Sequence, residues 1–182
     1  MNDIDRSIGV RTFASDAVHL IRTTQTIQYQ LSQMADQKAN MVLAASFVIF
    51  TVTLSQAKGG VATLPLPLMV LGASAFSAAF LAILAVLPSV KAPPKATGVK
   101  NVLFFNAFTQ IPEQEFVEML LGIMGDSKTM YEAMAHDIYQ NGQVLAHKKY
   151  RYLGYAYRIL LTGLVASFIT FMIPFLLRGL KV

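Results

Sequence analysis

The fold is decided by residues 36–55, which read DQKANMVLAASFVIFTVTLS. Asp36 and Lys38 are the only charged residues in this stretch, and residues 39–55 carry no formal charge. A charge-free run of about 17–25 residues can cross a bilayer as a helix, because its backbone hydrogen bonds all close within the helix. Residues 36–55 therefore predict the junction between a cytosolic helix and a first membrane span.

The composition also indicates a membrane protein. Of the 182 residues, 54% are hydrophobic and 14% are charged, whereas a soluble domain carries roughly 25% charged residues. The formal net charge of +5 is typical of basic residues that flank membrane spans and face anionic lipid, so no nucleic-acid partner is expected. The absence of cysteine excludes disulfides and thiolate metal sites.

The chain before the first span is predicted to be helical. Residues 13–35 contain no proline or glycine, and their apolar residues recur at helical spacing with polar residues between them. This pattern predicts an amphipathic cytosolic helix that continues into the first span without a break. Residues 13–56 are therefore predicted to form one element.

A short turn separates the first span from the second. Residues 56–67 contain a pair of glycines and two prolines, which indicate a turn between antiparallel spans. Residues 68–87 carry no charge and predict the second span. Small residues recur four apart within it, as at Ala75 and Ala79, and this spacing lets helix backbones approach closely in lipid. We expect these small residues to form a packing hub, within the chain or between chains, and in an oligomer to supply the interface.

Residues 88–157 are predicted to be a cytosolic linker and helical region. They begin with a basic, proline-rich linker, and a first helix is expected to start at Pro112 and to end at Gly125. Residues 129–132, Thr-Met-Tyr-Glu, have the spacing of a capping box and predict the start of the next helix.

The last helix is predicted to continue into the membrane. No proline interrupts it before Pro174, and tyrosines and basic residues cluster at residues 147–158, as in the aromatic and basic belts at membrane faces. Residues 159–177 carry no charge, which predicts a third span over residues 158–178. The expected fold is an all-α integral membrane protein with three transmembrane helices, two of them extended into a cytosolic helical bundle.

The orientation follows from the basic residues. Twelve of the 15 Lys and Arg residues lie before the first span or between the second and third spans. Because cytoplasmic segments are enriched in Lys and Arg, this asymmetry predicts that the N-terminus and residues 88–157 are cytoplasmic.

The sequence contains no constellation that predicts catalysis. Glu132 and His136 are four residues apart on one helix face, but a metal site needs three or four ligands, so no metal site is expected. The glycine pairs lack the sequence context of a phosphate-binding loop, and the serines lack that of a catalytic nucleophile. An enzyme is therefore not expected.

Several polar residues near the predicted cytosolic membrane face are candidates for ligand binding or gating. They are Asp36, Lys38, Asn106, Lys148, Lys149, Tyr150 and Arg151. Two interpretations stay open for them. Asp36 and Lys38 can form a surface pair with the lysine reaching the lipid headgroups, and the basic cluster can act as a cytoplasmic anchor. Alternatively, Lys and Arg charge can bind a ligand phosphate while tyrosine rings stack on a base.

Five short motifs follow one another along the chain. They are Ala35-Asp36-Gln37-Lys38-Ala39, Asn101-Val102-Leu103-Phe104-Phe105, residues 112–116, Asp137-Ile138-Tyr139, and Lys148-Lys149-Tyr150-Arg151-Tyr152-Leu153. In this order and spacing the chain resembles the small membrane effectors of Pycsar antiphage systems, and the resemblance covers roughly residues 25–177.

The resemblance implies a bacterial inner-membrane effector with a nucleotide cyclase as its functional partner. Infection would lead to synthesis of a cyclic pyrimidine mononucleotide, cCMP or cUMP, and the effector would respond by forming a homo-oligomer or by opening. Membrane integrity would then be impaired and the infection aborted. The resemblance implies no cofactor besides this ligand, and it transfers no ligand-binding residue.

A second hypothesis stays open beside the gated effector. The chain could be a non-gated membrane scaffold or accessory subunit whose cytosolic helices dock a partner protein. Polarity within the spans bears on this choice, because no charge lies inside any span, which disfavours a selective ion channel or a proton-coupled transporter.

Overall fold

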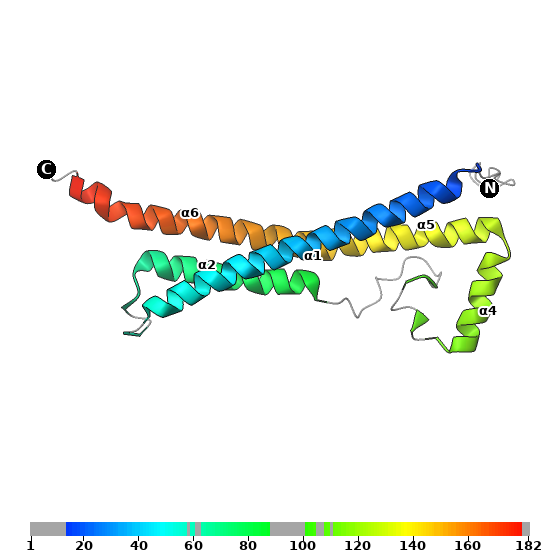
Figure 1. Cartoon of the computed structure of the whole chain (residues 1–182), viewed down its shortest axis with the longest axis horizontal. Helices are drawn as coiled ribbons and strands as arrows, with labels where there is room; N and C mark the ends of the chain where they lie inside the picture. Colours follow the sequence, from blue (N-terminus) through cyan, green and yellow to red (C-terminus); the bar gives the residue numbers. More distant parts are fainter. Residues whose placement is uncertain are drawn as a thin grey trace, which may run out of the picture. The chain divides into compact units, whose positions relative to one another are not determined.

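The computed structural model is helical throughout its regular elements. It describes residues 14–57, 59–60, 63–87, 101–104, 108–109 and 111–179, with the side chains of Phe175, Arg178 and Gly179 excepted. The elements in order are α1 (Ala17–Gln56), α2 (Leu66–Val86), α4 (Glu113–Met124), α5 (Ser127–Val144), the π-helical turn η2 (Leu145–Tyr150) and α6 (Arg151–Gly179) (Figure 1). No strand occurs in these described ranges, so the all-α fold class is confirmed.

Three helices are long and apolar enough to cross a membrane. They comprise Ala17–Gln56, Leu66–Val86 and Ser127–Pro174. Each includes most of one of the three charge-free runs that predicted the spans, so the number of candidate spans is confirmed. The third candidate passes through α5, η2 and α6, because no proline interrupts the chain before Pro174.

The described residues group into two compact units. The first unit contains the described parts of Met1–Leu31 and Ser89–Val144, and the second contains those of Ser32–Pro88 and Leu145–Val182. The proline-rich linker of residues 88–100 and the candidate Asn106 lie outside the described residues.

In the first unit, α4 packs against α5, and both helices have clear end signals. Pro112 is the N-cap of α4 rather than its first helical residue, and Glu113 and Glu115 follow in the first turn, where acidic side chains complement the helix dipole. At the other end, α4 stops before Gly125, as predicted, and the Gly125 N–H donates to the Leu121 carbonyl over 3.0 Å.

The predicted capping box at Thr129 is wrong, because the cap of α5 lies three residues earlier. Asp126 precedes the helix, and its Oδ2 accepts from the Thr129 N–H at 3.0 Å and from the Thr129 hydroxyl at 2.7 Å. These two hydrogen bonds hold the pKa of Asp126 below its usual value. Thr129 is therefore the third helical residue, whose N–H has no partner within the helix and is capped by Asp126.

The core of the second unit consists mainly of small side chains. Its buried members are Ala35, Ala39 and Val42 of α1, Ala78, Ala82 and Ala85 of α2, and Leu153 and Ala156 of α6. Within this unit α2 runs alongside α6 (Figure 1). Small residues let helix backbones approach closely, and the resulting van der Waals contact is a main source of helix association in lipid.

Glycines mark the closest approaches in the second unit. A Cβ added at Gly163 of α6 would overlap the side chain of Ser74 on α2. A Cβ added at Gly72 of α2 would lie 2.8 Å from the Thr53 methyl group on α1. These positions tolerate only glycine at the observed helix separation.

The small residues of the second span form a packing hub within the chain. Gly72, Ala75, Ala78, Ala82 and Ala85 of α2 are buried against their own chain. Other small residues of the same helix, Ala73 and Ser77, are exposed. A contact between copies of the chain through this helix stays a prediction.

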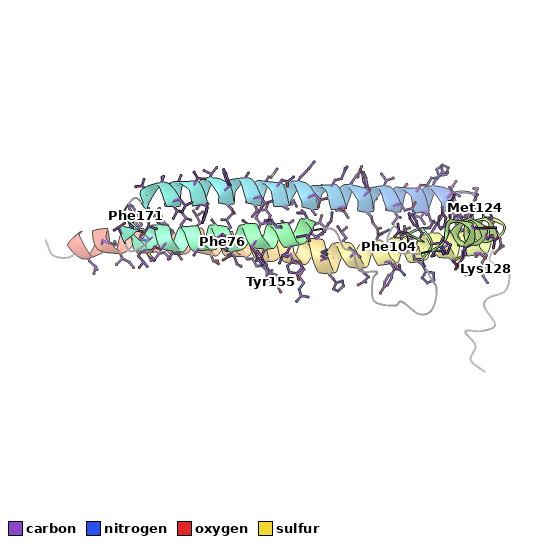
Figure 2. All side chains as sticks on the ribbon, turned by 90° about the horizontal axis from the view of Figure 1, so that it is seen from below. Phe76, Phe104, Met124, Lys128, Tyr155 and Phe171 are labelled. Carbon is purple, nitrogen blue, oxygen red and sulfur yellow. The ribbon has the colours of Figure 1, made fainter. Side chains whose placement is uncertain are left out.

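Large apolar side chains cover the outside of the second unit. Figure 2 labels two of them, Phe76 on α2 and Phe171 on α6, which are 62% and 52% exposed. Phe47 on α1 is also exposed. Extended exposed apolar surfaces mark contacts with a membrane or a partner protein, and small residues inside with large ones outside fit a bundle surrounded by lipid.

Candidate functional site

The basic cluster of the sequence falls on the π-helical turn. We expected a regular α-helix here, but residues Leu145–Tyr150 form η2, which contains His147, Lys148 and Lys149. A π-turn adds one residue to a helical turn, so it changes which side chains share a face, and such turns occur frequently at functional sites.

Lys149 binds α1 through three hydrogen bonds. Its Nζ donates to both carboxylate oxygens of Asp36 at 2.8 Å and to the hydroxyl of Ser32 at 2.8 Å. The Lys149 side chain is 21% exposed and that of Asp36 is 43% exposed. Because solvent screens a pair with this exposure, its contribution is about 1 kcal/mol, at the upper end of the range for surface pairs.

Lys148 contacts the end of α2. Its Nζ donates to the Leu87 carbonyl at 2.6 Å, and Leu87 is the C-cap of that helix. The last carbonyls of a helix lack intrahelical partners and carry partial negative charge, so a lysine is favourable there. The two neighbouring lysines of η2 therefore join it to α1 and to α2.

Lys38 does not form the predicted surface pair with Asp36. The carboxylate of Asp36 is directed to Lys149 instead, and the Lys38 side chain is exposed. The contact made by Lys38 is through its main chain, whose carbonyl accepts a hydrogen bond from the Tyr157 hydroxyl at 3.3 Å.

The remaining candidates have different surroundings. Tyr150 is partly buried and packs against the small-residue core, whereas Arg151 is exposed at the start of α6. The structure thus brings Asp36 and Lys149 together, places Lys148 and Tyr150 beside them on η2, and leaves the Arg151 side chain at the surface.

The first unit contains a buried polar cluster that the sequence analysis missed. The Asn101 side-chain amide donates to Asp137 Oδ1 at 3.2 Å and to Gln140 Oε1 at 2.9 Å. All three side chains are buried. The Asn101 Oδ1 accepts from the Leu103 N–H at 3.0 Å, which is an Asx turn that shapes the loop before the cluster.

Asp137 lacks a cationic partner within this cluster. Burial raises the pKa of its carboxyl group, and hydrogen bonds from Asn101, Asn141 and Gln25 oppose that rise. Neutral amide donors therefore hold a buried carboxylate, with desolvation as the larger effect. The sequence contained one signal of this cluster: Asp137 and Gln140 are three residues apart and thus share a helix face.

A second contact between α1 and α5 lies in the same unit. The Gln28 side-chain amide donates to the Ile138 carbonyl at 2.8 Å. Gly142 permits this approach, because an added Cβ there would lie 3.3 Å from the Gln28 Nε2.

A pocket of about 140 Å³ opens beside the polar cluster. Its walls come from the 101–102 loop, from α4 and from one face of α5. The lining residues are Asn101, Val102, Ile123, Thr129, Glu132, Ala133 and His136. Glu132 and His136, which the sequence placed on one helix face, thus lie together at this pocket, and the described residues contain no group of three or more His, Cys, Asp or Glu side chains placed for a metal ion.

The chain matches a known protein family over most of its length. The family described as Pycsar effector protein domain matches residues 19–176. No curated protein and no solved structure matches the chain.

Proposed function

Because the chain belongs to the Pycsar effector family, we propose that it is an inner-membrane antiphage effector that a cyclic pyrimidine mononucleotide switches from a closed to an open state. The open state impairs the membrane and aborts the infection. A nucleotide cyclase supplies the trigger, and the helical region outside the spans senses it. We also propose that the open state is a homo-oligomer, with the N-terminus and residues 88–157 in the cytoplasm.

The observation that carries this proposal is the extent of the family match. Residues 19–176 include nearly all of the first candidate span and the whole of the other two. The family assignment therefore concerns the membrane helices and the polar segments between them together.

The packing of the second unit supports a closed resting state. Its interior is filled by alanine and glycine contacts between helices, and the charge-free runs of residues 39–55, 68–87 and 159–177 contain no ionisable side chain. Such a unit contains no polar path across a membrane, so permeation requires the helices to rearrange.

The contacts of η2 support a gate at one end of these helices. Lys149 joins η2 to Asp36 of α1, and Lys148 joins it to Leu87 at the end of α2. Each contact is polar, partly exposed and worth only about 1 kcal/mol, so it can break without unfolding the apolar core. We assign Asp36 and Lys149 to gating, as a contact of the closed state that is absent from the open one.

The trigger acts by its difference in affinity for the two states. A nucleotide that binds the open state more tightly shifts the population toward it, and a nucleotide with equal affinity for both states shifts nothing. Weakening the closed state therefore lowers the nucleotide concentration needed to open the membrane.

The test is dye release from liposomes that contain the purified full-length protein. We expect release after addition of cCMP or cUMP and none with cAMP or without nucleotide. Asp36→Asn should release dye at a lower nucleotide concentration. Lys38→Gln removes a neighbouring charge that is not part of the Asp36–Lys149 ion pair, so this variant should behave as wild type. Intact liposomes with every cyclic nucleotide would refute the proposal and favour the non-gated scaffold.

A further inference from the structure

The pocket of the first unit has the size of one aromatic ring. Its volume is about 140 Å³, and a cavity of roughly 150 Å³ binds benzene. Sites that enclose a whole drug-sized ligand measure roughly 300–1,000 Å³. The pocket can therefore take a single six-membered ring, whereas a fused two-ring purine exceeds it.

The walls and the polar groups of the pocket suit a heteroaromatic ring with a hydrogen-bond donor. Val102, Ile123 and Ala133 supply apolar surface that can contact the faces of a ring. Glu132 and His136 lie on the same face of α5, one helical turn apart, and both line the pocket. Of these polar groups, the carboxylate of Glu132 accepts hydrogen bonds and repels anions.

Among the described residues that line the pocket there is no lysine or arginine. A phosphate is therefore not held inside the pocket, since anion recognition relies on cationic side chains or free backbone N–H groups. Near the pocket, the Thr129 N–H at the start of α5 is already bound to Asp126. A nucleotide must enter this pocket with its base and leave its phosphate outside.

From these features we infer that the pocket holds the pyrimidine base of the trigger and that Glu132 reads its exocyclic amino group. This inference rests on the proposed function, which supplies the cyclic pyrimidine mononucleotide as the ligand. Cytosine presents an amino donor at its Watson–Crick edge, and carboxylates accept from that group. Uracil presents an oxygen acceptor at the same position, so Glu132 favours cCMP over cUMP.

Asn101 gives the pocket a connection to the buried polar cluster. Asn101 itself lines the pocket, and its side-chain amide donates to Asp137 and Gln140 of α5. A base that enters the pocket therefore touches the residue that fastens the 101–104 loop to α5.

The experiment measures binding of cCMP, cUMP and cAMP to the full-length protein in detergent by calorimetry. Wild type should bind cCMP about tenfold more tightly than cUMP, the order of one base-edge hydrogen-bond pair, and should not bind cAMP. Glu132→Gln should lose this preference, because its amide can donate to the uracil oxygen. Ala133→Leu, which adds carbon atoms to the pocket wall, should bind neither pyrimidine nucleotide.

Glu118→Gln on α4 is the matched control, because Glu118 does not line the pocket; it should bind as wild type. Circular dichroism establishes that each variant is folded. Unchanged nucleotide binding in folded Glu132→Gln and Ala133→Leu, or equal affinity of wild type for cCMP and cAMP, would overturn the pocket assignment and leave the proposed function standing. Absence of binding of any cyclic nucleotide to wild type would overturn both.

Discussion

The close approach of α6 to α2 at Gly163 provides a quantitative test of the second unit. Gly163 faces Ser74, and a Cβ added to the glycine would overlap both the Oγ and the Cβ of the serine. The nearest backbone atom, the Ser74 Cα, would lie at 3.6 Å. Because the backbone fixes both Cβ positions, side-chain rotation cannot remove this overlap, and Gly163→Ala must push the two helices apart.

The magnitude follows from two opposing effects. Overpacking of a well-packed core costs about 1–3 kcal/mol, and replacing a helical glycine by alanine gains about 0.5–1 kcal/mol. From the midpoints of these two ranges, the net loss for Gly163→Ala is about 1.25 kcal/mol. For a chain of this length, a loss of 1 kcal/mol lowers the melting temperature by roughly 2–4 °C, so we expect a decrease of about 2.5–5 °C.

The assay is thermal unfolding of the protein in detergent, followed by far-ultraviolet circular dichroism. Gly154→Ala is the matched control, because it lies in α6 as well and an added Cβ there meets no atom within 4 Å. Its melting temperature should equal or exceed that of wild type. Ser74→Gly removes the atoms that Gly163→Ala would strike, so the double variant should recover most of the loss.

The refuting result is specific. If Gly163→Ala melts at or above the temperature of wild type, as Gly154→Ala is expected to do, α2 and α6 are not packed at the observed separation. If Ser74→Gly fails to restore the stability of Gly163→Ala, the loss arises elsewhere and the contact is not the cause.

Three further predictions concern single polar groups. Breaking the ion pair with Lys149→Gln should lower the nucleotide concentration for half-maximal dye release about fivefold, which corresponds to about 1 kcal/mol, and the exchange of Asp36→Lys with Lys149→Asp should restore it. Burial raises the pKa of Asp137 above the ordinary aspartate value of 3.8, so the folded state binds the proton of this carboxyl group more tightly than the unfolded state does. As the pH rises from 3.8 through the raised pKa, the unfolding free energy of wild type should therefore fall relative to that of Asp137→Asn. Ser46→Ala should stabilise the closed chain by about 1–2 kcal/mol in thermal unfolding, since the Ser46 hydroxyl is buried with no hydrogen-bond partner among the described residues.

Each of these predictions has an opposite outcome that contradicts it. An unchanged nucleotide response of Lys149→Gln would remove the ion pair from the gate. A wild type that gains stability relative to Asp137→Asn as the pH rises would mean that the carboxylate is favourably solvated or paired. For Ser46, the control is Ser77→Ala, whose exposed hydroxyl bonds the Ala73 carbonyl of its own helix; a Ser46→Ala variant less stable than this control would show that the hydroxyl has a partner.

The sequence predicted the helices because their signals are local. Charge-free runs of sufficient length identified the spans, and Gly125 identified the end of α4. The small residues of the second span correctly indicated close packing. Periodicity defines the face of a helix but not the partner that covers it, so the sequence left open whether these residues pack within the chain or between copies.

The long-range contacts could not be predicted from the same signals. Lys149 and Asp36 are 113 positions apart, and their pairing depends on how η2 packs in the second unit. The cluster of Asn101, Asp137 and Gln140 joins a loop to a helix that is 36 or more positions away. The π-turn also had no local signal, since the residues of Leu145–Tyr150 are compatible with a regular α-helix.

The most direct test of the effector function is the electrical current across a planar bilayer that contains only this protein. Addition of a cyclic pyrimidine mononucleotide to the side that carries residues 88–157 should raise the current, and addition to the opposite side should not. A bilayer that stays insulating after nucleotide is added to either side, with the protein shown to be inserted, would contradict a nucleotide-gated membrane effector.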